Sequence, residues 1–131
     1  MKIIAIDLGL KRIGLAYSAD PNFVTPLNPI ERKNRNQAAK AVQDVIKEWS
    51  AEALVVGIPM GGSSEEEMRR RVAHFMNLVD FDGEVYLQDE SHSSLEAEES
   101  MKGKMKQKKD GRIDSLAAKI ILERWIFSQK L

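Results

Sequence analysis

The chain has 131 residues, a length that fits one domain and is too short for two independent cores. Its hydrophobic content of 43% supports a globular core, and the absence of cysteine excludes a disulfide scaffold, a thiolate metal site and a cysteine nucleophile. No signal-peptide core or apolar stretch of membrane-spanning length is found in the sequence. We therefore expect a single domain over residues 1–131, located in the cytoplasm and without membrane contact.

Acidic and basic residues balance at 20 each, which argues mildly against a nucleic-acid partner. The charges are clustered, however. Lysines crowd residues 102–109, while glutamates gather over residues 65–67 and 96–99. Local patches decide phosphate binding more than the net charge does, so a nucleic-acid partner is not excluded.

The first third of the chain predicts three strands. Residues 2–8 form a buried apolar run and residues 12–18 alternate, so the two are expected to form a hairpin. Residues 24–32 predict a third strand, whose Pro26 and Pro29 lack amide hydrogens and therefore place it at a sheet edge.

The rest of the chain alternates between helices and strands. We expect a helix over about 35–50, a strand over 53–58, a helix capped by Ser64 and Glu67, a strand over 84–88, a weakly helical stretch over 93–101, a mobile basic loop over 102–111 and a last helix over about 112–128. A hairpin followed by alternating helices and strands predicts an α/β fold, in which helices pack on both faces of a mixed sheet.

Three acidic residues hold comparable places in this scheme. Asp7 ends the first strand, Glu90 follows the last strand, and Asp114 lies in the first turn of the last helix. If the first and fourth strands are neighbours, the three carboxylates converge at the carboxyl ends of the strands, where open α/β sheets place their sites. Converging carboxylates repel one another, and Mg²⁺ or Mn²⁺ relieves this. Two such ions can drive an in-line phosphodiester displacement.

Each acidic residue also has a plain structural explanation. Asp7 could shape the turn before Gly9, Glu90 could be a solvated loop residue, and Asp114 could favour the positive end of its helix. Only the three matched placements together favour a metal site with Asp7, Glu90 and Asp114 as catalytic and metal-binding residues.

Basic residues near these positions are candidates for substrate phosphates. We select the following: Lys11, Arg12, Lys108, Lys109 and Arg112. Arg69, Arg70 and Arg71 are instead expected to pair with the glutamates on their own helix. His74 is interpreted as structural and His92 as a surface residue, since neither belongs to a metal-ligand pattern.

Four segments resemble the YqgF/RuvX family of Holliday junction resolvases and pre-16S rRNA nucleases, in the order of that family: residues 4–18, 54–59, 89–91 and 111–123. The first and last are the most specific, with Asp-x-Gly-x-x-Arg-x-Gly and Ile-Asp-Ser-x-x-Ala. The resemblance implies a ribonuclease H-like fold with strand order 3-2-1-4-5 and a metal-binding triad carried over to Asp7, Glu90 and Asp114. Ser91 departs from the arginine usual in the family, which puts the substrate preference in doubt.

The leading hypothesis is a metal-dependent endonuclease that trims the 5′ end of pre-16S rRNA on ribosomal precursor particles, as a monomer or weak homodimer. Resolution of four-way DNA junctions is the alternative, and it requires paired subunits. A catalytically idle nucleic-acid-binding module has no use for three converging carboxylates. A sugar-kinase or actin-type ATPase shares the Asp-x-Gly hairpin but needs two such domains to enclose a nucleotide.

Overall fold

The computed structural model describes residues 1–90 and 112–129, and the side chains of Arg112 and Ile113 are not included in that description. One five-stranded sheet, of order β3-β2-β1-β4-β5, forms the centre of the molecule. The elements are β1 (Ile3–Leu8), β2 (Arg12–Asp20), β3 (Phe23–Glu31), α1 (Arg35–Trp49), β4 (Ala53–Ile58), α2 (Glu65–Val79), β5 (Glu84–Asp89) and α4 (Arg112–Gln129). The first three strands are antiparallel to one another, whereas β4 runs parallel to β1 and β5 parallel to β4.

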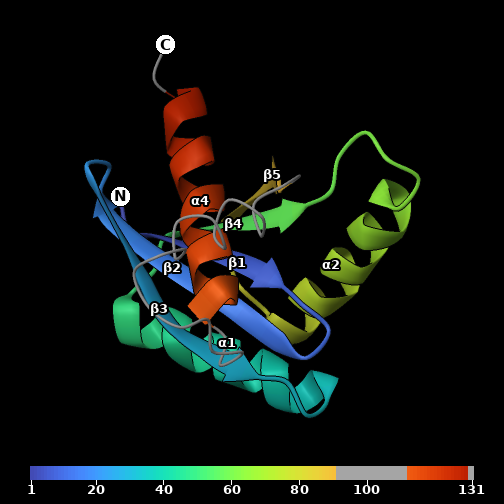
Figure 1. Cartoon of the computed structure of the whole chain (residues 1–131). Helices are drawn as coiled ribbons and strands as arrows, with labels where there is room; N and C mark the ends of the chain where they lie inside the picture. Colours follow the sequence, from blue (N-terminus) through green and yellow to red (C-terminus); the bar gives the residue numbers. More distant parts are fainter. Residues whose placement is uncertain (91–111, 130–131) are drawn as a thin grey trace.

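Helices cover both faces of the sheet, with α1 and α2 on one side and α4 on the other (Figure 1). Alternation along the strands explains the division, because successive side chains point to opposite faces. Ile4 and Ile6 of β1 pack with the core of α1 and α2, while Ile3 and Ala5 pack with α4. Every residue of β4 is buried, as expected for a strand covered on both sides.

The mixed sheet and the hairpin at its start are as predicted from the sequence pattern, and the strand order is the one that the family resemblance implies. The strand with Pro26 and Pro29 lies at the sheet edge, where a missing amide hydrogen disrupts no ladder on the open side. Within the described residues, no helix is both long and apolar enough to span a membrane. The predicted helical stretch over 93–101 and the basic loop over 102–111 lie outside the described residues.

The predicted capping box at Ser64 is wrong. Ser64 has helical backbone angles (φ −92°, ψ −3°), and its side chain makes no capping hydrogen bond. A side-chain cap requires an extended backbone at this position, which Asn34 provides at the start of α1. There the Asn34 side chain accepts from the Gln37 amide at 2.8 Å, and the Gln37 side chain accepts in return from the Asn34 amide. The true capping box therefore belongs to the first helix.

Candidate active site

Asp7 and Glu90 meet at the carboxyl edge of the sheet. Asp7 lies near the end of β1, where it pairs with Gly14 of β2. Glu90 directly follows β5, and its amide donates to the Ile58 carbonyl of β4 at 2.9 Å, which continues the ladder one residue beyond the end of β5. The two carboxyl groups lie close enough for Glu90 to raise the pKa of Asp7 both through its charge and through a side-chain hydrogen bond. Since a carboxylate only accepts, such a hydrogen bond favours the protonated form of Asp7.

Asp114 reaches the same edge because α4 lies unusually close to β2. A Cβ atom added to Gly14 would collide with the backbone carbonyl of Asp114, so only glycine leaves room for this turn of the helix. Ser115 is buried next to it and its Oγ donates to the Leu27 carbonyl at 2.7 Å. These two contacts fix the N-terminal turn of α4 against β2 and β3, and thereby the position of Asp114.

A second glycine makes room for Glu90. A Cβ atom on Gly57 of β4 would lie 3.0 Å from Glu90 Oε2 and would also collide with the Ile121 side chain. Asp7, Gly14 and Gly57 belong to strands β1, β2 and β4, which are neighbours in the sheet. The acidic residue is therefore flanked on both sides by glycines, and the sheet surface around Asp7 is open to the Glu90 side chain and to the backbone of α4.

Burial and mutual repulsion at this edge disfavour the ionised forms of Asp7 and Asp114. Burial, the charge of Glu90, the hydrogen bond with Glu90 and the charge of Asp114 raise the pKa of Asp7 to about 8. Burial also raises the pKa of Asp114, where the Arg12 cation works against it and the Glu31 carboxylate adds to it. The protein therefore holds a proton at Asp7 near neutral pH, unless a cation takes its place.

Oxygen ligands alone suit Mg²⁺ or Mn²⁺, which bind few carboxylates and fill their remaining positions with water and phosphate oxygens. The donor set of Asp7, Glu90 and Asp114 has this chemistry. Among the residues that the structure describes, however, no three His, Cys, Asp or Glu side chains are grouped closely enough to hold a metal ion. Asp7 and Glu90 are in direct contact, and Asp114 acts on Asp7 through its charge.

The structure places some of the predicted phosphate-binding residues near this edge. Arg12 begins β2, its Nε donates to Glu31 Oε1 at 3.1 Å, and its charge acts on Asp114. Lys11 is exposed in the turn between β1 and β2. Arg112 begins α4, but its side chain lies outside the described residues, as do Lys108 and Lys109.

The remaining predictions concern residues away from the acidic edge. Arg69, Arg70 and Arg71 pair with Glu65, Glu66 and Glu67 at the i, i+4 spacing, which confirms the predicted ion pairing. His74 is exposed, and its Nε2 accepts a hydrogen bond from Arg35. Ser91 and His92 lie outside the described residues.

Sequence reasoning did not find the spatial roles of Gly14, Gly57 and Ser115. Gly14 and Ser115 belong to the two most specific motif segments, and Gly57 interrupts an otherwise apolar run. The motifs can be read in the sequence, but they do not show which residue each one contacts, because the partner comes from a distant part of the chain.

The sequence model of the family described as "RuvX: Holliday junction resolvase" matches residues 1–128. The chain belongs to the RuvX family. A protein of Sulfurimonas denitrificans named "Putative pre-16S rRNA nuclease" is 66% identical over 126 residues, which cover 96% of this chain and 97% of the relative. A protein of Campylobacter lari with the same name is 54% identical and covers 94% and 95% of the two chains. The predicted family is therefore confirmed.

Two solved structures share the fold of this RuvX protein. T. thermophilus RuvC in complex with a Holliday junction substrate has a TM-score of 0.61 at 16% identity, covering 98% of this chain and 95% of that chain. The Fowlpox virus resolvase in complex with Holliday junction DNA has a TM-score of 0.58 at 11% identity, with 100% of both chains covered. The predicted fold class, a ribonuclease H-like mixed sheet, is confirmed by these neighbours and by the observed strand order.

Proposed function

We propose that this RuvX protein is a cytoplasmic, metal-dependent endonuclease, formed by residues 1–131 as one domain, which hydrolyses phosphodiesters at the 5′ end of pre-16S rRNA. The observation that carries the proposal is the contact between Asp7 and Glu90 at the carboxyl edge of the sheet, where burial and Glu90 raise the pKa of Asp7 to about 8. Such a pair is costly without a cation. The names of the relatives support RNA as the substrate.

Asp7, Glu90 and Asp114 would hold the metal, Mg²⁺ or Mn²⁺, in one or two copies. When bound, the ions would activate water for in-line attack on phosphorus and stabilise the leaving oxygen. The role of the protein side chains is to bring three oxygen donors to one place. Metal binding requires Asp7 as a carboxylate, so the proton that it holds in the metal-free protein must leave.

Lys11, Arg12 and Arg112 are proposed to contact substrate phosphates beside the metal. Arg12 supports this role through its position, because its charge already acts on Asp114. Lys108 and Lys109 are proposed as further contacts to the substrate backbone, and ribosomal precursor particles as the setting in which the substrate is met.

Resolution of four-way DNA junctions is the second candidate. It is supported by the description of the family and by the junction complexes of the two fold neighbours. A junction has two strands to cut symmetrically and therefore requires paired subunits. The same acidic edge would serve either substrate, so the two candidates differ in substrate and subunit number rather than in chemistry.

The test is cleavage of a structured pre-16S RNA and of a four-way DNA junction, each with Mg²⁺, Mn²⁺ or EDTA. We expect metal-dependent cutting of the RNA and a loss of at least about 10³-fold in Asp7→Asn, because several kcal/mol of charge stabilisation depend on the metal. Asp44→Asn is the matched control, since Asp44 is an exposed aspartate in α1 that pairs with Lys40. Cutting of neither substrate by folded wild type, or equal activity in Asp7→Asn, would overturn the proposal.

A further inference from the structure

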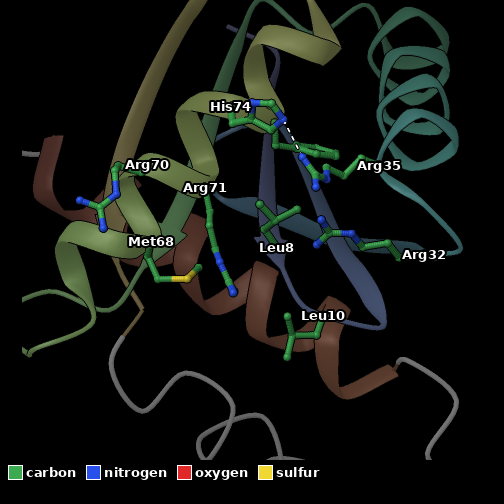
Figure 2. Close-up of a pocket in the computed structure, with 9 residues that line it drawn as sticks. Leu8, Leu10, Arg32, Arg35, Met68, Arg70, Arg71 and His74 are labelled. Atoms are coloured by element: carbon green, nitrogen blue, oxygen red, sulfur yellow. Dashed lines mark hydrogen bonds between the residues drawn. The ribbon is translucent and has the colours of Figure 1, made fainter.

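A pocket of about 410 Å³ opens on the α1 and α2 side of the same sheet edge (Figure 2). Its floor includes Leu8, the residue directly after Asp7. Because consecutive strand residues point to opposite faces, Leu8 packs toward α1 and α2 while Asp7 faces α4. The pocket and the acidic site therefore lie back to back across the carboxyl end of β1.

Four arginines line this pocket: Arg32, Arg35, Arg70 and Arg71. Arg70 pairs with Glu66. We call the site the arginine pocket and define it by the other three, Arg32, Arg35 and Arg71. They come from the segment after β3, from α1 and from α2, and Figure 2 shows their side chains around one opening. None of the described residues that line the pocket is acidic. The fold therefore gathers cations from three elements at one place.

Two of these cations are held by neutral groups. Arg32 Nη1 donates to the Gly9 carbonyl at 2.9 Å, and its guanidinium lies 5.7 Å from the centre of the Phe75 ring. Arg35 Nη1 donates to His74 Nε2 at 2.9 Å. A guanidinium has only donors, so His74 Nε2 is the acceptor in this contact. Neither contact supplies a negative charge, and both arginines are held in place.

The third cation is loosely paired. Arg71 Nη2 lies 3.5 Å from Glu67 Oε1, and both side chains are more than half exposed. Exposed pairs of this kind contribute little, so a phosphate can replace the glutamate at small cost. The positive end of α1 adds to the field, because its first turn contains no acidic residue.

The arginine pocket is also partly apolar. Leu8 and Met68 are partly buried and line its wall, and Leu10, which also lines the pocket, has 78% of its surface exposed. Apolar surface beside guanidinium groups suits a nucleotide unit, whose sugar and base pack against side chains while the phosphate binds the arginines. A free inorganic anion would leave this apolar surface unused.

We propose that the arginine pocket binds the phosphodiester backbone of the nucleic-acid substrate next to the scissile phosphate, so that the strand crosses the carboxyl end of β1 from one face of the sheet to the other. The identity of the ligand rests on the proposed function of the acidic site. The path of the strand is inferred from two consecutive residues, because Leu8 lines the pocket and Asp7 belongs to the acidic site.

The experiment measures binding of a short fluorescein-labelled single-stranded RNA to the full chain in EDTA, where no cleavage interferes. The test variant is the double substitution Arg35→Gln with Arg71→Gln, which removes two exposed cations. Its matched control is Lys40→Gln with Lys47→Gln, which removes the same charge from exposed positions on α1 outside the pocket lining.

We expect about a tenfold or greater loss of affinity in the test variant and less than about twofold in the control. The slope of log K against log salt should fall by about 0.7 for each phosphate that the variant no longer neutralises. The ring signals of His74 should shift on RNA binding in wild type, since its partner Arg35 engages the phosphate.

Equal losses in the two double variants, or no loss in either, would overturn the proposal. So would displacement of the RNA by inorganic phosphate or AMP at low concentration, because the arginine pocket would then serve a free anion. Cleavage with Mg²⁺ is scored separately. If the wild type never cleaves, but the test variant alone binds RNA more weakly than the wild type, the nuclease proposal is refuted and the pocket proposal is supported. If the wild type cleaves and the test variant binds RNA as tightly as the wild type, only the pocket proposal is refuted.

Discussion

The two faces of the sheet are built from side chains of different size. Toward α1 and α2 the strands present large aliphatic residues, which include Ile4, Ile6, Ile13, Leu15, Leu54 and Ile58. Toward α4 they present small ones near the acidic edge, namely Ala5, Ala16, Gly14 and Gly57. Large residues bury more apolar surface, whereas small ones let a helix backbone approach the sheet. The strands thus bury large side chains of their own under α1 and α2, whereas near the acidic edge their small residues set the position of Asp114.

Among changes to residues that pack the two faces, the largest expected effect comes from filling the space at Gly14. Gly14→Ala places a methyl group against the Asp114 carbonyl, so α4 must shift. We expect a loss of about 10²-fold in cleavage rate, since a displacement near 1 Å costs about that much, and about 1–3 kcal/mol of unfolding free energy. Rates and urea unfolding curves measure both.

The matched control is Gly62→Ala in the loop before α2, where an added Cβ atom meets nothing within 4 Å. It should leave rate and stability nearly unchanged. Equal effects of the two substitutions would show that the contact between Gly14 and α4 does not position the site.

The pH dependence of stability gives an effect of intermediate size. The pKa of Asp7 is about 8 in the folded protein against an ordinary value of 3.8, so the folded state binds more protons between these limits. The unfolding free energy contributed by this group is therefore greatest below about pH 4 and falls as the pH rises toward 8. We expect a fall of about 1–2 kcal/mol, allowing for access of water to a half-buried site.

Asp7→Asn should remove this dependence and make the metal-free protein more stable than wild type at pH 8. Urea unfolding in EDTA at pH 5 and pH 8 measures it. Adding Mg²⁺ at pH 8 should stabilise wild type and not the variant. Parallel pH curves for the two proteins would contradict the proton held at Asp7.

The smallest effect is expected on the opposite face. Ile4→Val removes one methyl group from the core beneath α1 and α2 and should cost about 1 kcal/mol of unfolding free energy. The cleavage rate at 25 °C should stay within about twofold of wild type, because Ile4 points away from α4. A large loss of cleavage rate without a matching loss of stability would contradict the claim that only the α4 face positions the acidic site.

The fold could be predicted largely from the sequence because its signals are local. The apolar run over 53–58, the two prolines of β3 and the periodicity of the helices each specify an element where it stands. The Ser64 capping box failed because spacing alone does not fix the backbone angles of the capping residue. The resemblance supplied the strand order.

The approach of Asp7 and Glu90 at the carboxyl edge of the sheet was also predictable, but the residues that position the acidic groups were not. Gly14 leaves room for the backbone of Asp114, and Ser115 donates a hydrogen bond to the Leu27 carbonyl, and both contacts join residues far apart in the sequence. The arginine pocket was missed for the same reason, since Arg32, Arg35 and Arg71 converge only after α1 and α2 pack together. Arg71 was correctly expected to pair with a glutamate of its own helix, but that pairing gave no sign that Arg71 also lines the arginine pocket.

The close seat of α4 on Gly14 also bears on when the nuclease becomes active. Asp7 comes from the first strand, Glu90 from the end of the last strand and Asp114 from the final helix. A chain that has been synthesised only as far as β5 can begin to form the sheet but lacks the last carboxylate. The site is thus the part of the fold with the longest loops to close, and such contacts form late. An unfinished polypeptide emerging from a ribosome would therefore lack the proposed metal site and could not use it to cut the RNA around it.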